Sequence, residues 1–233
     1  MARTLFVTGT DTGVGKTTLG IALAAALTAD GVRVAPFKPA ETGCRSSPGG
    51  LLPDDALRLR AAAQRSDLTL DLICPFRYAE PVAPAVAGPA PVDLQTLRSA
   101  HATLSAHADL VLLEGAGGLL VPYADSLLAA DLATVFDAEL LIVARASLGT
   151  INHTLLTLAE ARRRQLRVLG VVLNETTAPG PDAPTNAAQI AHHGDCAVFG
   201  PFPRLADPTP ATLAETLRTR VPELLARVRA LAI

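Results

Sequence analysis

The first thirty residues restrict the possible fold more than any other part of the chain. A short apolar run, Thr4–Thr8, leads into a glycine-rich turn and then into an Ala- and Leu-rich segment, Lys16–Ala29. The turn reads Gly9-Thr10-Asp11-Thr12-Gly13-Val14-Gly15-Lys16-Thr17-Thr18. In a strand–turn–helix unit, backbone N–H groups and the helix N-terminus can hold a phosphate, the lysine can reach its outer oxygens, and the threonine can bind Mg²⁺. The segment therefore predicts a phosphate-binding loop within an α/β fold.

The loop departs from its usual pattern in one place. Five residues separate Gly9 from Gly15, and Thr10 stands where the first glycine is usual. The later positions Gly13, Gly15 and Lys16 are intact. A glycine-rich turn without phosphate chemistry is the alternative, and the surrounding strand and helix argue against it.

The cations of the chain are distributed unevenly between the two basic residue types. There are two lysines and eighteen arginines. Lys16 lies in the loop, and Lys38 lies in Phe37-Lys38-Pro39-Ala40-Glu41-Thr42-Gly43, directly after the next apolar run. Lysine is a compact charge on a flexible stem, whereas arginine presents a broad planar fork. We interpret the two lysines as positions where a guanidinium does not fit; chance placement is the alternative.

The rest of the chain alternates short apolar runs with longer Ala/Leu-rich segments, a pattern typical of a largely parallel sheet with helices on both faces. We predict one α/β domain over residues 1–233. Two segments are predicted to be irregular, the Pro-rich Pro75–Pro91 and the loop Thr176–Pro184. The predicted strands are Thr4–Thr8, Val32–Phe37, Leu110–Glu114, Leu140–Ala144, Val168–Leu173 and Ala197–Gly200. The predicted helices are Lys16–Ala29, Asp54–Gln64, Val92–Ala106, Ala129–Phe136, Asn152–Arg164, Asn186–His193, Pro210–Arg218 and Val221–Leu231.

Composition argues against several classes of function. The formal net charge is −2, and the basic triplet Arg162-Arg163-Arg164 ends a predicted helix, so we expect no nucleic-acid partner. The longest apolar stretch, Leu19–Leu27, is too short to span a membrane. Because the first residues lead straight into a predicted strand, we expect no signal peptide. Three cysteines without metal-like spacing suggest reduced thiols in a cytoplasmic protein.

Three acidic residues are candidates for binding a cation beside the predicted phosphate site. Glu114 ends a strand and opens Glu114-Gly115-Ala116-Gly117-Gly118. Such an acid is a candidate Mg²⁺ ligand, although taken alone it is equally consistent with a loop acid. Asp54 and Asp55 open a helix, where an N-cap is the simplest role. With Thr17 and Glu114 nearby, one of the two can cap while the other completes an oxygen-rich Mg²⁺ site.

Other polar residues at element ends leave alternatives open. Asn174 ends a strand, where its amide can contact an adenine edge or cap a loop. Asn152 is expected to be a helix N-cap, and its neighbour His153 is not expected to be catalytic. The apolar residues of the C-terminal segment have helical spacing, which favours core packing over a membrane-surface helix. They are Val221, Leu224, Leu225, Val228 and Leu231.

Taken in order, the motifs resemble those of the dethiobiotin synthetase family. Beyond the phosphate loop, the resemblance is carried by Phe-Lys-Pro-Ala-Glu-Thr-Gly, Asp-Asp-Ala-Leu, Glu-Pro-Val-Ala-Pro, Glu-Gly-Ala-Gly-Gly, Gly-Thr-Ile-Asn-His and Leu-Asn-Glu. The motifs extend from residue 4 to about residue 205. Their joint order is specific to the family, although only the phosphate loop is specific by itself. The resemblance implies a homodimeric, cytoplasmic P-loop NTPase-like enzyme. It also implies an ATP- and Mg²⁺-dependent ring closure of 7,8-diaminononanoate with CO2, by way of a carbamate and a carbamic–phosphoric anhydride.

The resemblance also implies roles for particular residues. Lys16 and Lys38 would be catalytic, and Thr17, Asp55 and Glu114 would bind Mg²⁺. Substrate contacts would come from Thr42 and, across the dimer interface, from Gly149, Thr150 and Asn152. Asn186 lies near the position where some relatives have a tyrosine that binds the substrate carboxylate, and its contact is left open. The nucleotide would be bound by Gly13, Val14, Gly15, Lys16, Thr17, Thr18, Asp55, Glu114, Gly115, Ala116, Gly117, Asn174, Glu175, Pro203, Arg204 and Leu205.

Two other functions use the same core. A switch ATPase of the chromosome-partitioning or septum-positioning kind carries a second lysine in the phosphate loop where this chain has Asp11. A cobyrinate-type amide synthetase needs a glutaminase with a nucleophilic cysteine, and Cys196 has no suggestive motif around it. Both are less consistent with the sequence than ring closure.

Overall fold

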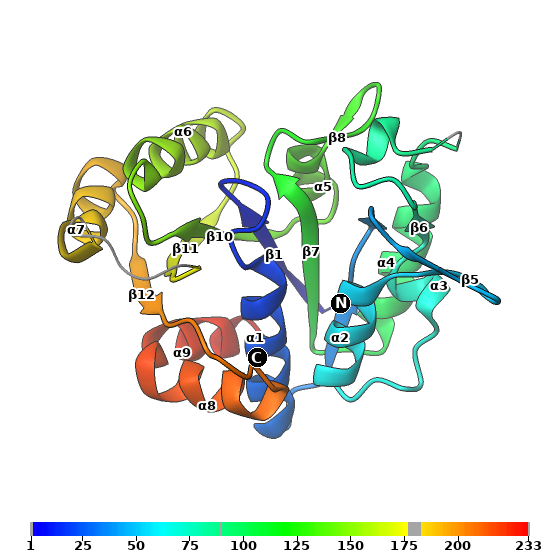
Figure 1. The fold of residues 1–233 in the computed structure, drawn as a ribbon, viewed down its shortest axis with the longest axis horizontal. Coiled ribbons are helices and arrows are strands. Elements are labelled where there is room, and N and C mark those ends of the chain that lie inside the picture. Colours follow the sequence, from blue (N-terminus) through cyan, green and yellow to red (C-terminus); the bar gives the residue numbers. More distant parts are fainter. Residues whose placement is uncertain (1, 89, 177–182, 233) are drawn as a thin grey trace.

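A six-stranded parallel sheet forms the centre of the molecule (Figure 1). The computed structural model describes residues 2–88, 90–176 and 183–232. The strand order is β12-β11-β10-β1-β7-β2. All six predicted strands are confirmed, with ends shifted by a few residues. They are β1 (Arg3–Gly9), β2 (Val34–Phe37), β7 (Leu110–Gly118), β10 (Glu139–Arg145), β11 (Val168–Asn174) and β12 (Val198–Phe202).

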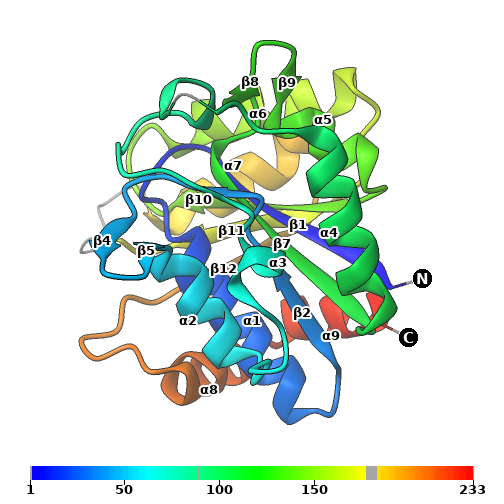
Figure 2. The same ribbon diagram turned by 90° about the vertical axis from the view of Figure 1, so that its right-hand side faces the viewer.

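Helices cover both faces of this sheet, as predicted (Figure 2). Alternate side chains of β1 show how the two cores are separated: Leu5 and Val7 pack with α1, α8 and α9, whereas Phe6 packs with α4 and α5. Because both faces are buried, the strands read as continuous apolar runs. The helices are α1 (Lys16–Ala29), α2 (Asp54–Ala62), α3 (Leu70–Ile73), α4 (Leu94–Ala106), α5 (Ala129–Val135), α6 (Thr150–Arg163), α7 (Ala183–Gly194), α8 (Pro210–Arg220) and α9 (Pro222–Leu231).

The two edge strands each contain a proline. Among the described residues, β2 with Pro36 pairs only with β7, and β12 with Pro201 pairs only with β11. Proline has no N–H to donate, so it suits a strand whose outer edge has no neighbour. The prolines are therefore placed where they cost the sheet no hydrogen bond.

Two segments predicted to be irregular contain short regular elements. Within Pro75–Pro91 lie the two-residue strand β6 (Phe76–Arg77) and the 3₁₀ turn η1 (Pro84–Val86). Helix α7 begins at Ala183, inside the predicted loop Thr176–Pro184, because proline is tolerated in the first turn of a helix; residues 177–182 lie outside the described residues. The remaining short strands are β3 (Ala40–Glu41), which pairs with β6, and two hairpins, β4 (Arg45–Ser47) with β5 (Gly50–Leu52) and β8 (Pro122–Ala124) with β9 (Leu127–Leu128).

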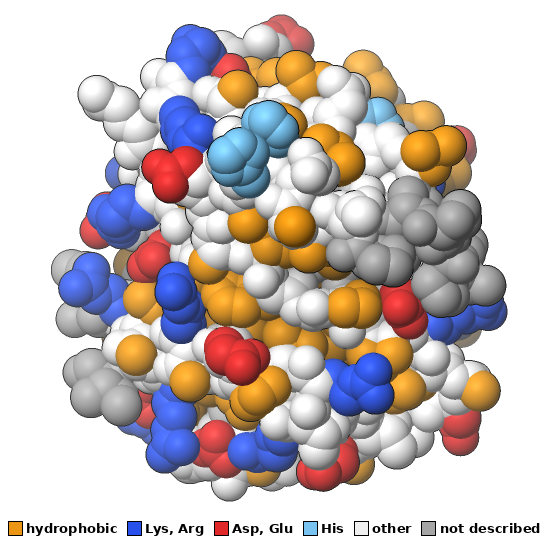
Figure 3. All heavy atoms as spheres, turned by 90° about the vertical axis from the view of Figure 1, so that its left-hand side faces the viewer, with side chains coloured by type: hydrophobic (Ala, Val, Ile, Leu, Met, Phe, Trp, Pro, Cys, Tyr) orange, Lys and Arg blue, Asp and Glu red, His pale blue; other side chains and the backbone are white. Residues whose placement is uncertain are grey.

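The C-terminal helix and the molecular surface agree with several of the predictions. The C-terminal helix buries Leu224 and Val228 completely, so its apolar side is core, as predicted. Arg162 and Arg163 lie in the last turn of α6. The three cysteines are free. Within the described residues, no helix is both long and apolar enough to cross a bilayer. On the face of α7, β12 and α9, basic side chains are interspersed with acidic ones around a central group of hydrophobic ones (Figure 3).

One partly buried histidine, His101 of α4, links that helix to the sheet. His101 Nε2 lies 2.8 Å from the Thr4 hydroxyl, and its ring stacks on Phe136 with centroids 4.4 Å apart. Burial lowers its pKa from 6.5 to about 4. The folded protein thus keeps this ring neutral at pH values where the unfolded chain would protonate it.

We expect the free energy of unfolding to decrease as the pH falls from about 6.5 to about 4, because the unfolded state binds the proton more tightly than the folded one. Urea unfolding across this range should show a smaller acid-side decrease in His101→Gln, whose amide can still bond to Thr4. His107→Gln, at the exposed end of the same helix, is the control. An equal decrease in the parent and in His101→Gln would contradict the assignment.

Candidate active site

The phosphate loop joins β1 to α1 at the carboxyl edge of the sheet, where parallel α/β sheets bind ligands. Gly13 and Gly15 have φ values of 72° and 97°, which favour glycine. Val14 between them is fully buried. Asn174, at the end of β11, donates from Nδ2 to the Val14 carbonyl over 2.8 Å. The structure thus shows the loop-capping role for Asn174, and its contact with adenine stays a prediction.

Asp11 ties the loop to β10. Its carboxylate accepts the N–H of Thr12 at 2.7 Å and pairs with Arg145, the last residue of β10. Lys16 extends back along the loop and donates to the Asp11 carbonyl at 3.2 Å. Burial lowers the pKa of the Lys16 ammonium, and nearby Glu114 opposes that shift. The loop is therefore anchored by two neighbouring strands, β10 and β11.

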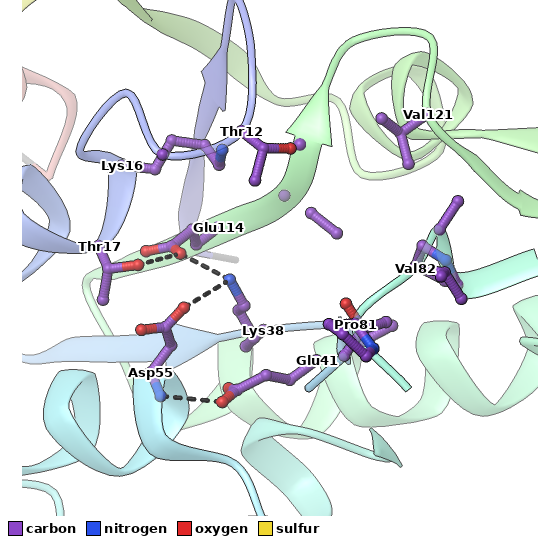
Figure 4. Close-up of a pocket in the computed structure, with 18 of the residues that line it drawn as sticks. Thr12, Lys16, Thr17, Lys38, Glu41, Asp55, Pro81, Val82, Glu114 and Val121 are labelled. Atoms are coloured by element: carbon purple, nitrogen blue, oxygen red, sulfur yellow. Dashed lines mark hydrogen bonds and ion pairs between the residues drawn. The ribbon is translucent and has the colours of Figure 1, made fainter. Parts of the chain in front are cut away.

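Lys38 lies at the inner end of the site because of strand register. Phe37, the last residue of β2, pairs with Leu113 of β7, so Lys38, which follows β2, lies beside Glu114 of β7. Lys38 Nζ donates to Glu114 Oε1 over 2.6 Å and lies 3.5 Å from Asp55 Oδ2 (Figure 4). Burial disfavours this ammonium, but the carboxylates of Glu114 and Asp55 outweigh it and hold the pKa of Lys38 above its ordinary value.

Glu114 also contacts the phosphate loop. Its Oε1 accepts the Thr17 hydroxyl at 2.8 Å, and the side chain of Glu114 is fully buried. Its second oxygen, Oε2, has no hydrogen-bond partner among the described residues. A buried carboxylate oxygen without a partner is costly unless a ligand or cation satisfies it.

The start of α2 corrects the prediction that Asp54 or Asp55 caps the helix. The N-cap residue is Pro53, which has no side-chain acceptor. The carboxylate of Glu41 takes that place, because it accepts the N–H of Asp55 at 2.9 Å and of Ala56 at 3.0 Å. Asp54 instead forms an exposed ion pair with Arg45. Asp55 is left to face Lys38.

These groups line one cavity of about 500 Å³. One wall is the phosphate loop, and the floor is formed by Lys38, Asp55 and Glu114 (Figure 4). The opposite wall is apolar and includes Pro81, Val82 and Val121. The predicted site residues in this cavity are Gly13, Gly15, Lys16, Thr17, Thr18, Lys38, Thr42, Asp55, Glu114, Gly115, Ala116 and Gly117; Val14 packs beneath it.

The other predicted site residues lie outside this cavity in two groups. Glu175 follows β11 and donates its N–H to the carbonyl of Phe202 at 2.9 Å, which places it beside Pro203, Arg204 and Leu205 after β12. The second group, Gly149, Thr150 and Asn152, begins α6. The buried Asn186 lies on α7.

Asn152 is not the N-cap of α6, contrary to prediction. The helix begins at Thr150, after Gly149, because the Thr150 N–H closes a turn on the Ser147 carbonyl at 3.1 Å. Asn152 is therefore an exposed residue of the first turn. The Thr150 hydroxyl is buried and without a hydrogen-bond partner among the described residues.

Three contacts at the site were not predicted. They are the cap by Glu41, the Asp11–Arg145 pair, and the buried hydroxyl of Tyr123, which accepts the Ala116 N–H at 2.8 Å. Burial raises the pKa of Tyr123 to about 12. Each joins residues of different segments that lie at least seven positions apart, so no local spacing indicates it. The position of Glu41 within the Lys38 motif was the one available signal.

The sequence matches the family described as "AAA domain" over residues 3–212. It is 47% identical over 193 residues to the ATP-dependent dethiobiotin synthetase BioD of Anaeromyxobacter dehalogenans (strain 2CP-1), covering 81% of this chain and 84% of that protein. The BioD of Thermodesulfovibrio yellowstonii is 35% identical over 223 residues, covering 91% and 92%. The chain belongs to the dethiobiotin synthetase family.

Solved structures of similar fold include other enzymes and ATPases. A cobyrinic acid a,c-diamide synthase from Mycobacterium smegmatis, solved with ADP and magnesium, aligns with a TM-score of 0.53 at 20% identity over 92% of each chain. The Aquifex aeolicus MinC:MinD complex aligns with a TM-score of 0.61 at 15% identity over 98% of this chain and 94% of that chain. At these identities the likeness shows the fold alone. It agrees with the predicted P-loop α/β class.

The oxygens at the floor of this synthetase-family site suit a hard divalent cation. Thr17 contributes a hydroxyl, Asp55 a partly buried carboxylate, and Glu114 a buried carboxylate that Thr17 and Lys38 contact. Mg²⁺ prefers such oxygens and usually keeps several waters, so few protein ligands suffice. No group of three or more His, Cys, Asp or Glu residues that could hold a metal is found in the described ranges. The donors at the floor are hydroxyl and carboxylate oxygens, which suit Mg²⁺ rather than a softer metal.

The two loop glycines differ in what a side chain would meet. A Cβ on Gly15 would lie 2.0 Å from Asn174 Nδ2, whereas a Cβ on Gly13 would meet nothing within 4 Å. Both have positive φ, so alanine costs about 1–2 kcal/mol of backbone strain at either.

We expect Gly15→Ala to weaken Mg-ADP binding by more than about tenfold, and Gly13→Ala by no more than about threefold, because only the first displaces Asn174 from the loop. Isothermal titration calorimetry measures both, and melting temperatures show that each variant is folded. Equal losses of affinity would mean that backbone strain, not the Asn174 contact, limits the loop.

Proposed function

We propose that this chain closes the ureido ring of dethiobiotin from 7,8-diaminononanoate, CO2 and ATP. The observation that supports this best is the buried Lys38 ammonium, which faces the phosphate loop across one cavity. Phosphoryl transfer to a small anion requires cations on both the phosphates and the acceptor. Lys16 supplies the first and Lys38 the second. The names of its relatives, ATP-dependent dethiobiotin synthetases, support this reading.

The reaction needs no protein nucleophile. One amine adds to CO2 and loses a proton to give a carbamate, and a carbamate oxygen then attacks the γ-phosphorus while ADP departs. The second amine attacks the carbonyl carbon of the resulting carbamic–phosphoric anhydride, loses its proton and expels phosphate. Every step passes through oxyanions, so the chain contributes charge stabilisation and positioning.

Particular residues would divide this work. The loop N–H groups and Lys16 hold the phosphates, and Lys38 stabilises the carbamate oxygen as it approaches phosphorus. Thr17, Asp55 and Glu114 would hold Mg²⁺, which when bound neutralises phosphate charge. The Thr42 hydroxyl would contact the substrate near its amines. The apolar wall of Pro81, Val82 and Val121 suits a hydrocarbon chain.

The start of α6 would complete the substrate site from a second copy of the chain. Gly149, Thr150 and Asn152 do not line the cavity of their own chain, yet they offer a helix N-terminus suited to a carboxylate. Three large side chains beside them are exposed, Leu120 at 53%, Leu148 at 88% and Leu156 at 62%. Exposed apolar groups of this kind favour a homodimer.

Adenine would lie on the other side of the phosphate loop, among Asn174, Glu175 and Pro203–Leu205. We propose a cytoplasmic enzyme without nucleic-acid or membrane partners. The switch ATPase is less well supported. In this chain the loop position that carries its second lysine is Asp11, and the Asp11 carboxylate is bound by Arg145 within the same chain.

The test of this function is the substrate requirement for ATP turnover. We expect Mg-ATP hydrolysis by the purified protein to be slow alone and to rise sharply with 7,8-diaminononanoate and bicarbonate, because the carbamate is the phosphoryl acceptor. Phosphate release and dethiobiotin formation should agree in amount. Equal turnover with and without the diamine, in the presence of bicarbonate, would rule out the synthetase function.

Lys38→Arg tests whether Lys38 supplies a shaped cation or only charge. We expect it to slow single-turnover product formation about a hundredfold, or ~3 kcal/mol, nearly as much as Lys38→Ala. A guanidinium is too broad to approach one oxygen between Glu114 and Asp55. ADP affinity and melting temperature, measured separately, show whether the variants fold. A Lys38→Arg rate within about threefold of the parent would mean that general charge suffices.

A further inference from the structure

The carboxylate of Glu41 holds the start of a helix that is distant from it in sequence. Asp55 and Ala56, in the first turn of α2, donate their N–H groups to Glu41 Oε1 and Oε2 at 2.9 and 3.0 Å. Glu41 is only 6% exposed. A helix N-cap is usually a local Ser, Thr, Asp or Asn, and the local residue here is Pro53, which cannot accept a hydrogen bond through its side chain. The cap is therefore provided by a buried acid from another segment.

The same segment carries Lys38. It leaves β2 at Phe37, presents Lys38 to Glu114, and reaches Glu41 in β3 three residues later. Glu41 binds the backbone of Asp55, while the side chain of Asp55 lies 3.5 Å from Lys38 Nζ (Figure 4). One short segment thus fixes both the lysine and the helix that carries its second acidic partner.

Glu41 is poorly suited to bind a ligand directly, although it borders the cavity. Each of its carboxylate oxygens already accepts a backbone N–H group. Burying a carboxylate is costly unless it is hydrogen-bonded in this way. Its contribution to the site is therefore the position that it gives to Asp55.

We propose that Glu41 is a positioning residue, which places the Asp55 carboxylate for the divalent cation by clamping the first turn of α2. The proposal rests on the proposed function, in which Asp55, Thr17 and Glu114 hold Mg²⁺. Residues that orient a metal ligand commonly change metal affinity about 10- to 100-fold when they are substituted. A cap with a purely structural role would change stability and leave Mg²⁺ affinity unaltered.

The test compares Glu41→Gln with substitutions of the two acids in the first turn of α2, Asp55→Asn and Asp54→Asn. The glutamine has the same shape, but its NH2 group cannot accept one of the two N–H groups. Calorimetry measures ADP binding to each folded variant as a function of Mg²⁺ concentration, with ADP in EDTA as the metal-free reference. We expect Glu41→Gln and Asp55→Asn each to raise the Mg²⁺ half-saturation about tenfold, and Glu41→Gln to leave metal-free ADP binding unchanged. Asp54→Asn, which removes an exposed ion pair on the same turn, should stay within about twofold.

The double variant Glu41→Gln/Asp55→Asn decides whether Glu41 acts through Asp55. If it does, the Mg²⁺ half-saturation of the double variant should equal that of Asp55→Asn alone. Multiplied effects would show independent action and overturn the proposal. A lower melting temperature of Glu41→Gln with unchanged Mg²⁺ dependence would also overturn it, leaving the proposed function intact. An unchanged Mg²⁺ dependence of Asp55→Asn would instead refute the metal assignment in the proposed function, and the positioning role with it.

Discussion

The buried ion pair between Lys38 and Glu114 is the interaction on which the arrangement of the site depends. Glu114 is fully buried and Lys38 is 4% exposed, and their charged atoms are 2.6 Å apart. A buried charge left without its partner costs about 3–5 kcal/mol, so neither residue can be lost without a penalty. The pairing of β2 with β7 places both residues at the same level of the sheet. Thr17 is held by the same carboxylate, which ties the phosphate loop to this pair.

The glycine-rich loop is held in place by contacts with two strands and with the core. Asn174 holds it from β11 and Arg145 holds it from β10, while Val14 anchors it in the core. Ligand binding then needs little further ordering of the backbone, which preserves binding free energy for the reacting groups. The same contacts explain why the loop tolerates threonine at position 10, since its conformation does not rest on glycines alone.

The structural elements that depend on the local sequence pattern were predicted correctly. The six apolar runs became the six strands, and Lys16–Ala29 was predicted with its correct ends, because burial on both faces and a glycine before the lysine leave clear signals. Of the three residues at the floor of the cavity, Lys38 and Glu114 were singled out because they follow apolar runs, and Asp55 because it lies at the start of a helix. The cap of α2 could not be predicted, since Glu41 and Asp55 are fourteen residues apart and meet only through the path of the chain. The start of α6 was missed because the turn at Ser147–Gly149, rather than the side chain of Asn152, begins the helix.

The charges of the site explain why a lysine is needed between the two carboxylates. Lys38 is held by Glu114 and Asp55 at once, so its charge is already balanced within the protein. In the proposed function these carboxylates would bind a divalent cation, and the ammonium of Lys38 would then be free to face a substrate anion. A flexible four-carbon stem allows that change of partner within a small cavity. A guanidinium, bound to the same carboxylates through a rigid planar fork, would be held in place by them.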